Sequence, residues 1–86
     1  MPRVSKSFGI IIAMYYDDHN PPHFHAVYQG EEAQISIETL DVLKGSLPRR
    51  ALALVLEWSV LHRSELRENW DKARRGLPLD SIAPLD

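Results

Sequence analysis

The chain has 86 residues, contains no cysteine and carries a formal net charge of −2 at pH 7. This length predicts one domain over residues 1–86, and the lack of cysteine excludes disulfides and thiolate metal sites. We therefore expect a small cytoplasmic protein, without a membrane partner, in a reducing compartment.

The charge is unevenly distributed along the chain. Residues 1–47 hold three basic and six acidic residues, whereas residues 48–76 hold seven basic and four acidic ones. The basic segment permits contact with nucleic acid. Its acids are interleaved with its bases, however, and this favours a solvated helix surface.

The run "SFGIIIAMYYD", residues 7–17, is almost continuously apolar. This pattern is typical of a strand buried on both faces, and the run is too short to cross a bilayer as a helix. Pro21 and Pro22 follow, and they predict a stiff turn after the strand.

The segment "HFHAVYQGEEAQISIET", residues 23–39, alternates between apolar and polar residues on both sides of Gly30. This pattern predicts a β-hairpin, in which we expect Tyr28 to lie opposite Ala33. That register predicts four further pairs: Phe24 with Ile37, Ala26 with Ile35, His23 with Glu38, and His25 with Ser36. Because side chains alternate across a strand, His23 and His25 should share a polar sheet face turned away from the apolar layer.

The remaining segments complete an α+β fold. The stretch "LDVLKG" predicts a short last strand, and a helical period begins at Pro48 and changes phase after His62. We expect a three- or four-stranded antiparallel sheet with two C-terminal helices packed on one face. The strands should lie within 8–44, the helices within 48–75 and an extended tail over 77–86. One bent helix is the alternative to two.

Three segments carry a resemblance to a known family: "MPRVSKSFGIIIAMYYDDHNPPHFHAVY", "ISIETLDVLKGSLPRRALALVLEW" and "HRSELRENWDKARRGLPLDSIAPL". They resemble, over essentially the whole chain, the prokaryotic family catalogued as domain of unknown function 4160. Ser7 departs from the bulky apolar residue expected there. The resemblance implies the toxin-like side of a two-gene toxin–antitoxin pair, with a small protein from the neighbouring gene as partner and RNA as a target. It transfers no catalytic residue.

Three of the four histidines lie in the segment "DDHNPPHFH", residues 17–25. Histidine titrates near neutral pH, so two imidazoles on one surface could act as base and acid on an RNA phosphodiester. The candidate catalytic residues are His19, His23, His25 and Glu38, with His25 central. The candidate substrate-binding residues are Arg49 and Arg50, which could stabilise phosphate charge, and Ser36.

The same segment also fits a metal site. His23 and His25 leave one strand face two residues apart, so both rings could bind one ion. The candidate ligands are His19, His23, His25 and Asp17, with Asp18 as an alternative carboxylate. This donor set suits zinc or another first-row divalent metal.

Two readings without chemistry remain. The cluster could be a structural network in a turn, in which Asp18 and Asn20 bond backbone amides. The protein could also be a binding module that adds a partner strand at a sheet edge, or that self-associates through its edges or its tail.

Overall fold

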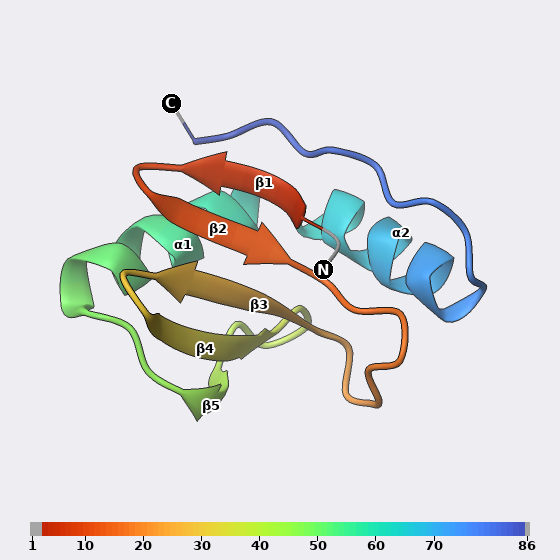
Figure 1. Ribbon diagram of the computed structural model, residues 1–86, viewed down its shortest axis with the longest axis horizontal. Coiled ribbons are helices and arrows are strands. Elements are labelled where there is room, and N and C mark those ends of the chain that lie inside the picture. Colours follow the sequence, from red (N-terminus) through yellow and green to blue (C-terminus); the bar gives the residue numbers. More distant parts are fainter. Residues whose placement is uncertain (1–2, 86) are drawn as a thin grey trace.

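The computed structural model describes residues 3–85 and contains one five-stranded sheet followed by two helices (Figure 1). The elements are β1 (Arg3–Ser7), β2 (Ile10–Ala13), β3 (His23–Tyr28), β4 (Glu31–Ser36), β5 (Val42–Gly45), α1 (Arg49–Leu61) and α2 (Arg63–Arg74). Every neighbouring pair of strands is antiparallel, and the order in the sheet is the order in the chain. The expected α+β arrangement is confirmed, with one or two more strands than predicted.

The additional strand comes from a turn inside the first apolar run. Phe8 and Gly9 have φ of 53° and 77°, and Ser7 lies opposite Ile10. A two-residue loop with two positive φ values joins antiparallel strands tightly. The run that was expected to form one strand is therefore a hairpin. Its first strand, Arg3–Ser7, precedes the predicted limits of 8–44, and β5 ends one residue beyond them.

The β3–β4 hairpin differs from the predicted register by two residues. Gln29 and Gly30 both have positive φ, at 47° and 83°, so the loop holds two residues and Tyr28 lies opposite Glu31. The observed pairs replace all the predicted ones: Phe24 with Ile35, Ala26 with Ala33, His23 with Ser36, and His25 with Gln34. A shift of two residues preserves the faces, since side chains alternate with period two.

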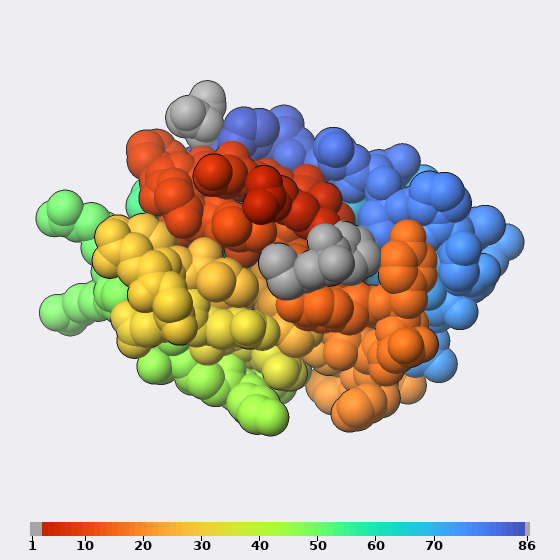
Figure 2. Space-filling model, viewed as in Figure 1, coloured from red at the N-terminus to blue at the C-terminus, as the bar shows by residue number. Residues whose placement is uncertain are grey.

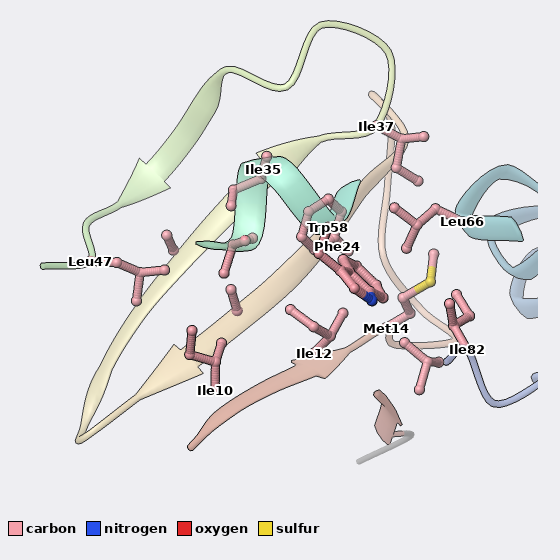
Figure 3. Packing of buried hydrophobic residues seen from close by; sticks show 14 of the residues in the cluster. Ile10, Ile12, Met14, Phe24, Ile35, Ile37, Leu47, Trp58, Leu66 and Ile82 are labelled. Carbon is pink, nitrogen blue, oxygen red and sulfur yellow. The ribbon is translucent and has the colours of Figure 1, made fainter. Parts of the chain in front are cut away.

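The core lies between the sheet and the helices, where Figure 3 shows side chains from both layers in contact. Phe24 from β3 is fully buried, and its ring meets Trp58 of α1 edge-on with centroids 6.1 Å apart. Met14 just after β2, Ile35 of β4 and Leu66 of α2 are also fully buried. This layer of apolar side chains fixes the position of β3, and with it the two histidines of that strand.

The two helices are separate and meet at His62. Its φ of −118° interrupts the helical conformation, and its backbone N–H bonds the carbonyls of Trp58 and Ser59. The α2 helix ends at Arg74, and the φ of +71° at Gly76, two residues later, allows Leu77 N–H to bond the Lys72 carbonyl. Both helices lie within the predicted limits of 48–75.

The tail after α2 crosses back over the molecule beside β1 (Figures 1 and 2). Asn69 exchanges two hydrogen bonds with the backbone of Asp80, each 2.9 Å long. Ile82 N–H donates to the Val4 carbonyl, and Trp58 Nε1–H donates to the carbonyl of residue 83. The tail therefore connects α2, β1 and α1. It is described through residue 85, and residue 86 of the expected tail lies outside the described residues.

Candidate metal centre

His23 and His25 leave β3 on the face opposite Phe24, as the alternation of side chains predicts. Both residues are only 5% exposed, so this polar face is buried at the two histidines. The His23 ring lies 5.3 Å from Trp70 of α2, and the two imidazole centroids are 5.2 Å apart. Trp70 of α2 therefore contributes to the burial of His23.

Tyr15, in the loop just after β2, covers His25. Ala13 lies opposite His25, and Tyr15, two residues further on, remains on the same face. Its ring meets the imidazole edge-on at 4.4 Å. Burial raises the pKa of the Tyr15 hydroxyl, and the carboxylates of Glu32 and Asp18 raise it further. Tyr15 therefore lies in a partly dry and negatively charged site.

Asp18 supplies a carboxylate that faces both imidazoles. Its Oδ2 lies 2.9 Å from His25 Nε2 and 3.3 Å from His23 Nε2. Asp18 belongs to the β2–β3 loop, residues 14–22, and its side chain is 21% exposed. One oxygen from the loop thus lies beside two nitrogens from the strand, and the site opens to solvent along Asp18.

The hydrogen-bond partner of Nδ1 shows which ring nitrogen of His23 carries the proton. Nδ1 lies 2.9 Å from the Pro21 carbonyl, and since a carbonyl only accepts, Nδ1 carries the proton. In the neutral ring, Nε2 then carries a lone pair and no proton. It is buried, lies within ion-pair distance of Asp18 Oδ2, and lacks a hydrogen-bond partner among the described residues. Two electron-rich atoms facing each other in a buried site are stabilised by a cation between them, either a proton on Nε2 or a metal ion.

His25 differs in that both of its ring nitrogens lie within hydrogen-bond distance of a carboxylate, Nδ1 of Glu32 and Nε2 of Asp18. Its Nδ1 donates to Glu32 Oε2 at 2.7 Å, which directs Nε2 toward Asp18. A metal-binding histidine commonly donates its other N–H to a carboxylate or a backbone carbonyl, which fixes the tautomer and orients the ring. Glu32 and the Pro21 carbonyl act in this way on His25 and His23, respectively. Both rings therefore direct Nε2 to the same point.

The donor atoms fit a divalent transition metal in number and spacing. His23 Nε2, His25 Nε2 and an Asp18 carboxylate oxygen all lie within 4.8 Å of one another. Ligands roughly 2.0–2.1 Å from zinc in tetrahedral geometry are about 3.3 Å apart, close to the two separations from Asp18. Two imidazoles and one carboxylate form a three-ligand set that leaves a fourth position for water or substrate.

Two predicted ligands lie outside this group. His19 and Asp17 are exposed in the β2–β3 loop, on either side of Asp18, and the group of converging ligand atoms does not include them. The carboxylate that lies beside the histidines is Asp18. Of the predicted metal ligands, the structure thus brings His23 and His25 together.

Glu38 does not approach the histidines, because the register places Ser36 opposite His23. The Glu38 carboxylate instead accepts two hydrogen bonds, of 2.7 and 2.9 Å, from Arg67 of α2. These bonds hold the pKa of Glu38 below its ordinary value. The pair therefore stabilises the fold above the ordinary carboxyl pKa, and this contribution is lost as the pH falls through the lowered pKa.

The predicted substrate-binding residues are dispersed. Ser36 Oγ accepts the backbone N–H of Thr39 at 3.1 Å, and Ser36 is thus part of the turn after β4. Arg49 is exposed, in the first turn of α1. Arg50 lines a depression with Tyr28, at the opposite end of β3 from His23. The structure does not bring these side chains to the histidine pair.

Sequence reasoning missed Glu32, the second carboxylate of the site. The pairing of Val27 with Glu32 places Glu32 diagonally next to His25 on the same face, within reach of its ring. If the turn is taken as the two residues Gln29 and Gly30, the register pairs Val27 with Glu32 and predicts that Glu32 lies beside His25. Trp70 carried no such signal, because its contact with His23 depends on how α2 packs.

Fold and site together define a small α+β protein with a buried two-histidine, one-aspartate group on its sheet. The chain belongs to the family described as domain of unknown function (DUF4160), whose model matches residues 9–71. The match contains all four side chains of the site. No curated protein and no solved structure matches the chain. Within residues 3–85, neither helix is long and apolar enough to span a membrane.

Replacing Glu32 by alanine is expected to lower zinc affinity by about 10–100-fold, because His25 would lose the acceptor that orients its ring. Glu31→Ala is the matched control, since Glu31 is an exposed neighbour on the opposite face of β4. Competition titration of zinc against a chromophoric chelator measures both variants. Equal affinities for the two variants would contradict the role of Glu32.

Proposed function

We propose that this protein binds a divalent first-row transition metal, with zinc the best match, through His23, His25 and Asp18. The observation that carries the proposal is the buried Nε2 lone pair of His23, which faces the Asp18 carboxylate without a hydrogen bond. A cation at this point would satisfy both atoms. The donor set of two nitrogens and one oxygen favours zinc and its neighbours over calcium or magnesium, which prefer oxygen ligands.

The arrangement supports a catalytic metal rather than a purely structural one. Structural zinc sites usually have four protein ligands, whereas catalytic sites keep a position for water or substrate. A divalent metal at such a position acts as a Lewis acid on a bound carbonyl or phosphoryl oxygen. Around it, Glu32 orients His25, Tyr15 and Trp70 exclude water, and Asp18 connects the site to solvent. We propose metal-assisted hydrolysis as the reaction class.

Metal-independent acid–base chemistry by His25 has less support from the same geometry. Both of its ring nitrogens lie within hydrogen-bond distance of carboxylates, so neither is directed at a substrate. RNA cleavage and a role in a toxin–antitoxin pair with a neighbouring gene product remain proposals. So do cytoplasmic localisation and self-association. The proposed RNA cleavage is compatible with a metal-assisted reaction.

Zinc binding tests the proposal directly. The wild type is expected to bind one zinc ion per chain, and His23→Ala, His25→Ala and Asp18→Ala should each lower the affinity by at least about 100-fold. This loss should exceed that expected for a group that only orients a ligand. His19→Ala and Asp17→Ala are matched controls from the same segment and should bind zinc like the wild type. Circular dichroism checks that every variant is folded.

Cleavage of a mixed RNA pool, with and without chelator, separates the reaction classes. Cleavage that chelator abolishes and zinc restores supports a metal-assisted reaction on RNA. Cleavage that persists in chelator and disappears in His25→Ala would favour acid–base chemistry instead. A folded wild type that binds no zinc, or a loss of affinity in His19→Ala equal to that in His23→Ala, would overturn the proposed metal centre.

A further inference from the structure

The α2 helix borders the metal site with one arginine that points to the loop carrying Asp18. Trp70 lies beside the His23 ring, and Arg74 follows four residues later, one turn along the same side of the helix. Arg74 Nη1 donates to Asn20 Oδ1 at 3.4 Å. Asn20 is two residues from Asp18, and the β2–β3 loop lies next to α2 in Figures 1 and 2. Arg74 is therefore placed at the rim of the site.

Among the described residues, Arg74 forms no ion pair with a carboxylate; among the other cations from Arg63 to Arg75, Arg63 likewise forms none. Arg67 binds Glu38, Arg75 lies 3.2 Å from Asp71, and Lys72 pairs with Asp80. Within residues 3–85, Arg74 makes one long hydrogen bond, to the neutral amide oxygen of Asn20. A guanidinium has five N–H donors, so most of its binding capacity is directed to solvent at this rim.

We infer that Arg74 binds a phosphate group of the substrate while another oxygen of that phosphate faces the metal held by His23, His25 and Asp18. This inference rests on the proposed metal centre and names its substrate class as phosphate esters. A guanidinium matches the geometry of phosphate oxygens and can bind two of them at once. The hydrogen bond to Asn20 positions Arg74, and the β2–β3 loop connects Asn20 to the ligand Asp18.

A phosphate fits the two groups better than a carboxylate does. Its oxygens point in several directions, so one can approach the metal while others bind a guanidinium on the rim. The two oxygens of a carboxylate point the same way. Asp17 and Asp18 make the empty loop negative, which repels anions in the absence of metal. Phosphate binding therefore requires the metal-loaded protein.

Calorimetric titration of the zinc-loaded full chain with phenyl phosphate tests this inference, with benzoate as the matched carboxylate probe. Arg74→Gln is expected to lower affinity for phenyl phosphate by at least about tenfold, the effect of losing a hydrogen bond to a charged group. Arg75→Gln is the matched control, because Arg75 is the adjacent arginine and binds Asp71. Zinc affinity should be the same in both variants and the wild type.

The zinc titration separates failure of this inference from failure of the proposed function. Zinc binding without detectable phenyl phosphate binding overturns the role of Arg74 and leaves the metal centre standing. Equal loss of phenyl phosphate affinity in Arg74→Gln and Arg75→Gln also overturns it, as does benzoate binding of equal strength. Absence of zinc binding in the wild type overturns the metal centre and this inference together.

Discussion

The Phe24→Ala variant is expected to lose about 3–5 kcal/mol of unfolding free energy, because it leaves a cavity in the core. Phe24 is 0% exposed, lies opposite Ile35, and meets Trp58 of α1 edge-on. Its removal therefore weakens the contact between sheet and helix as well as the packing within the sheet. The total free energy of unfolding of a small domain is about 5–15 kcal/mol. This variant should therefore be partly unfolded at physiological temperature.

Urea titration followed by far-ultraviolet circular dichroism measures this loss. Phe8→Ala is the control, because Phe8 has the same side chain but is 57% exposed in the β1–β2 turn. We expect it to change stability by no more than about 0.5 kcal/mol. Similar losses in the two variants would contradict the placement of Phe24 at the centre of the core.

The second large effect is expected for Gly45→Ala in β5. The φ of Gly45 is +77°, and a Cβ atom added there would lie 2.1 Å from the backbone carbonyl oxygen of Glu32. Because that neighbour is backbone in a paired strand, β4 and β5 must separate to accept the methyl group. The displaced residue is Glu32, the partner of His25. We expect a loss of stability together with a loss of zinc affinity.

Alanine at position 45 would be strained both by the positive φ and by the close backbone of Glu32. The Gly30→Ala variant tests the first cause alone. Gly30 also has a positive φ, of +83°, but a Cβ there meets nothing within 4 Å. It should therefore lose only the roughly 1–2 kcal/mol that a left-handed conformation costs a non-glycine residue. Thermal unfolding of the two variants should show a loss for Gly45→Ala at least twice as large. A larger effect at Gly30 would refute the close approach of β4 and β5.

Periodicity alone predicted the fold class and the faces of the central hairpin. Apolar spacing gave the helices, and alternation placed His23 and His25 together, opposite Phe24. The predicted register was wrong by two residues, because register depends on whether the loop at Gly30 holds two residues or four. Likewise, Gly9 was read as part of one strand, although with Phe8 it forms a two-residue turn. Both errors arise from turns, where one dihedral angle changes the pairing of a whole strand.

The histidines of the site were predicted, and most of their partners were not. His23 and His25 share a strand, so their relation is local and readable from spacing. Asp18 was considered only as an alternative to Asp17, and the choice between adjacent loop aspartates depends on the path of the loop. The contacts of Trp70 and Arg74 with this site depend on the docking of α2, a tertiary contact across some fifty residues of chain.

The tail has a consequence for the behaviour of the protein at high concentration. The outer edge of a sheet presents unpaired backbone groups, which recruit strands from other molecules and lead to aggregation. At the β1 edge the tail covers these groups, and Ile82 N–H bonds the Val4 carbonyl directly. At the β5 edge the strand is only four residues long and carries Lys44, two features that oppose edge-to-edge pairing. The two edges of one sheet are thus protected in different ways, the first by covering and the second by brevity and charge.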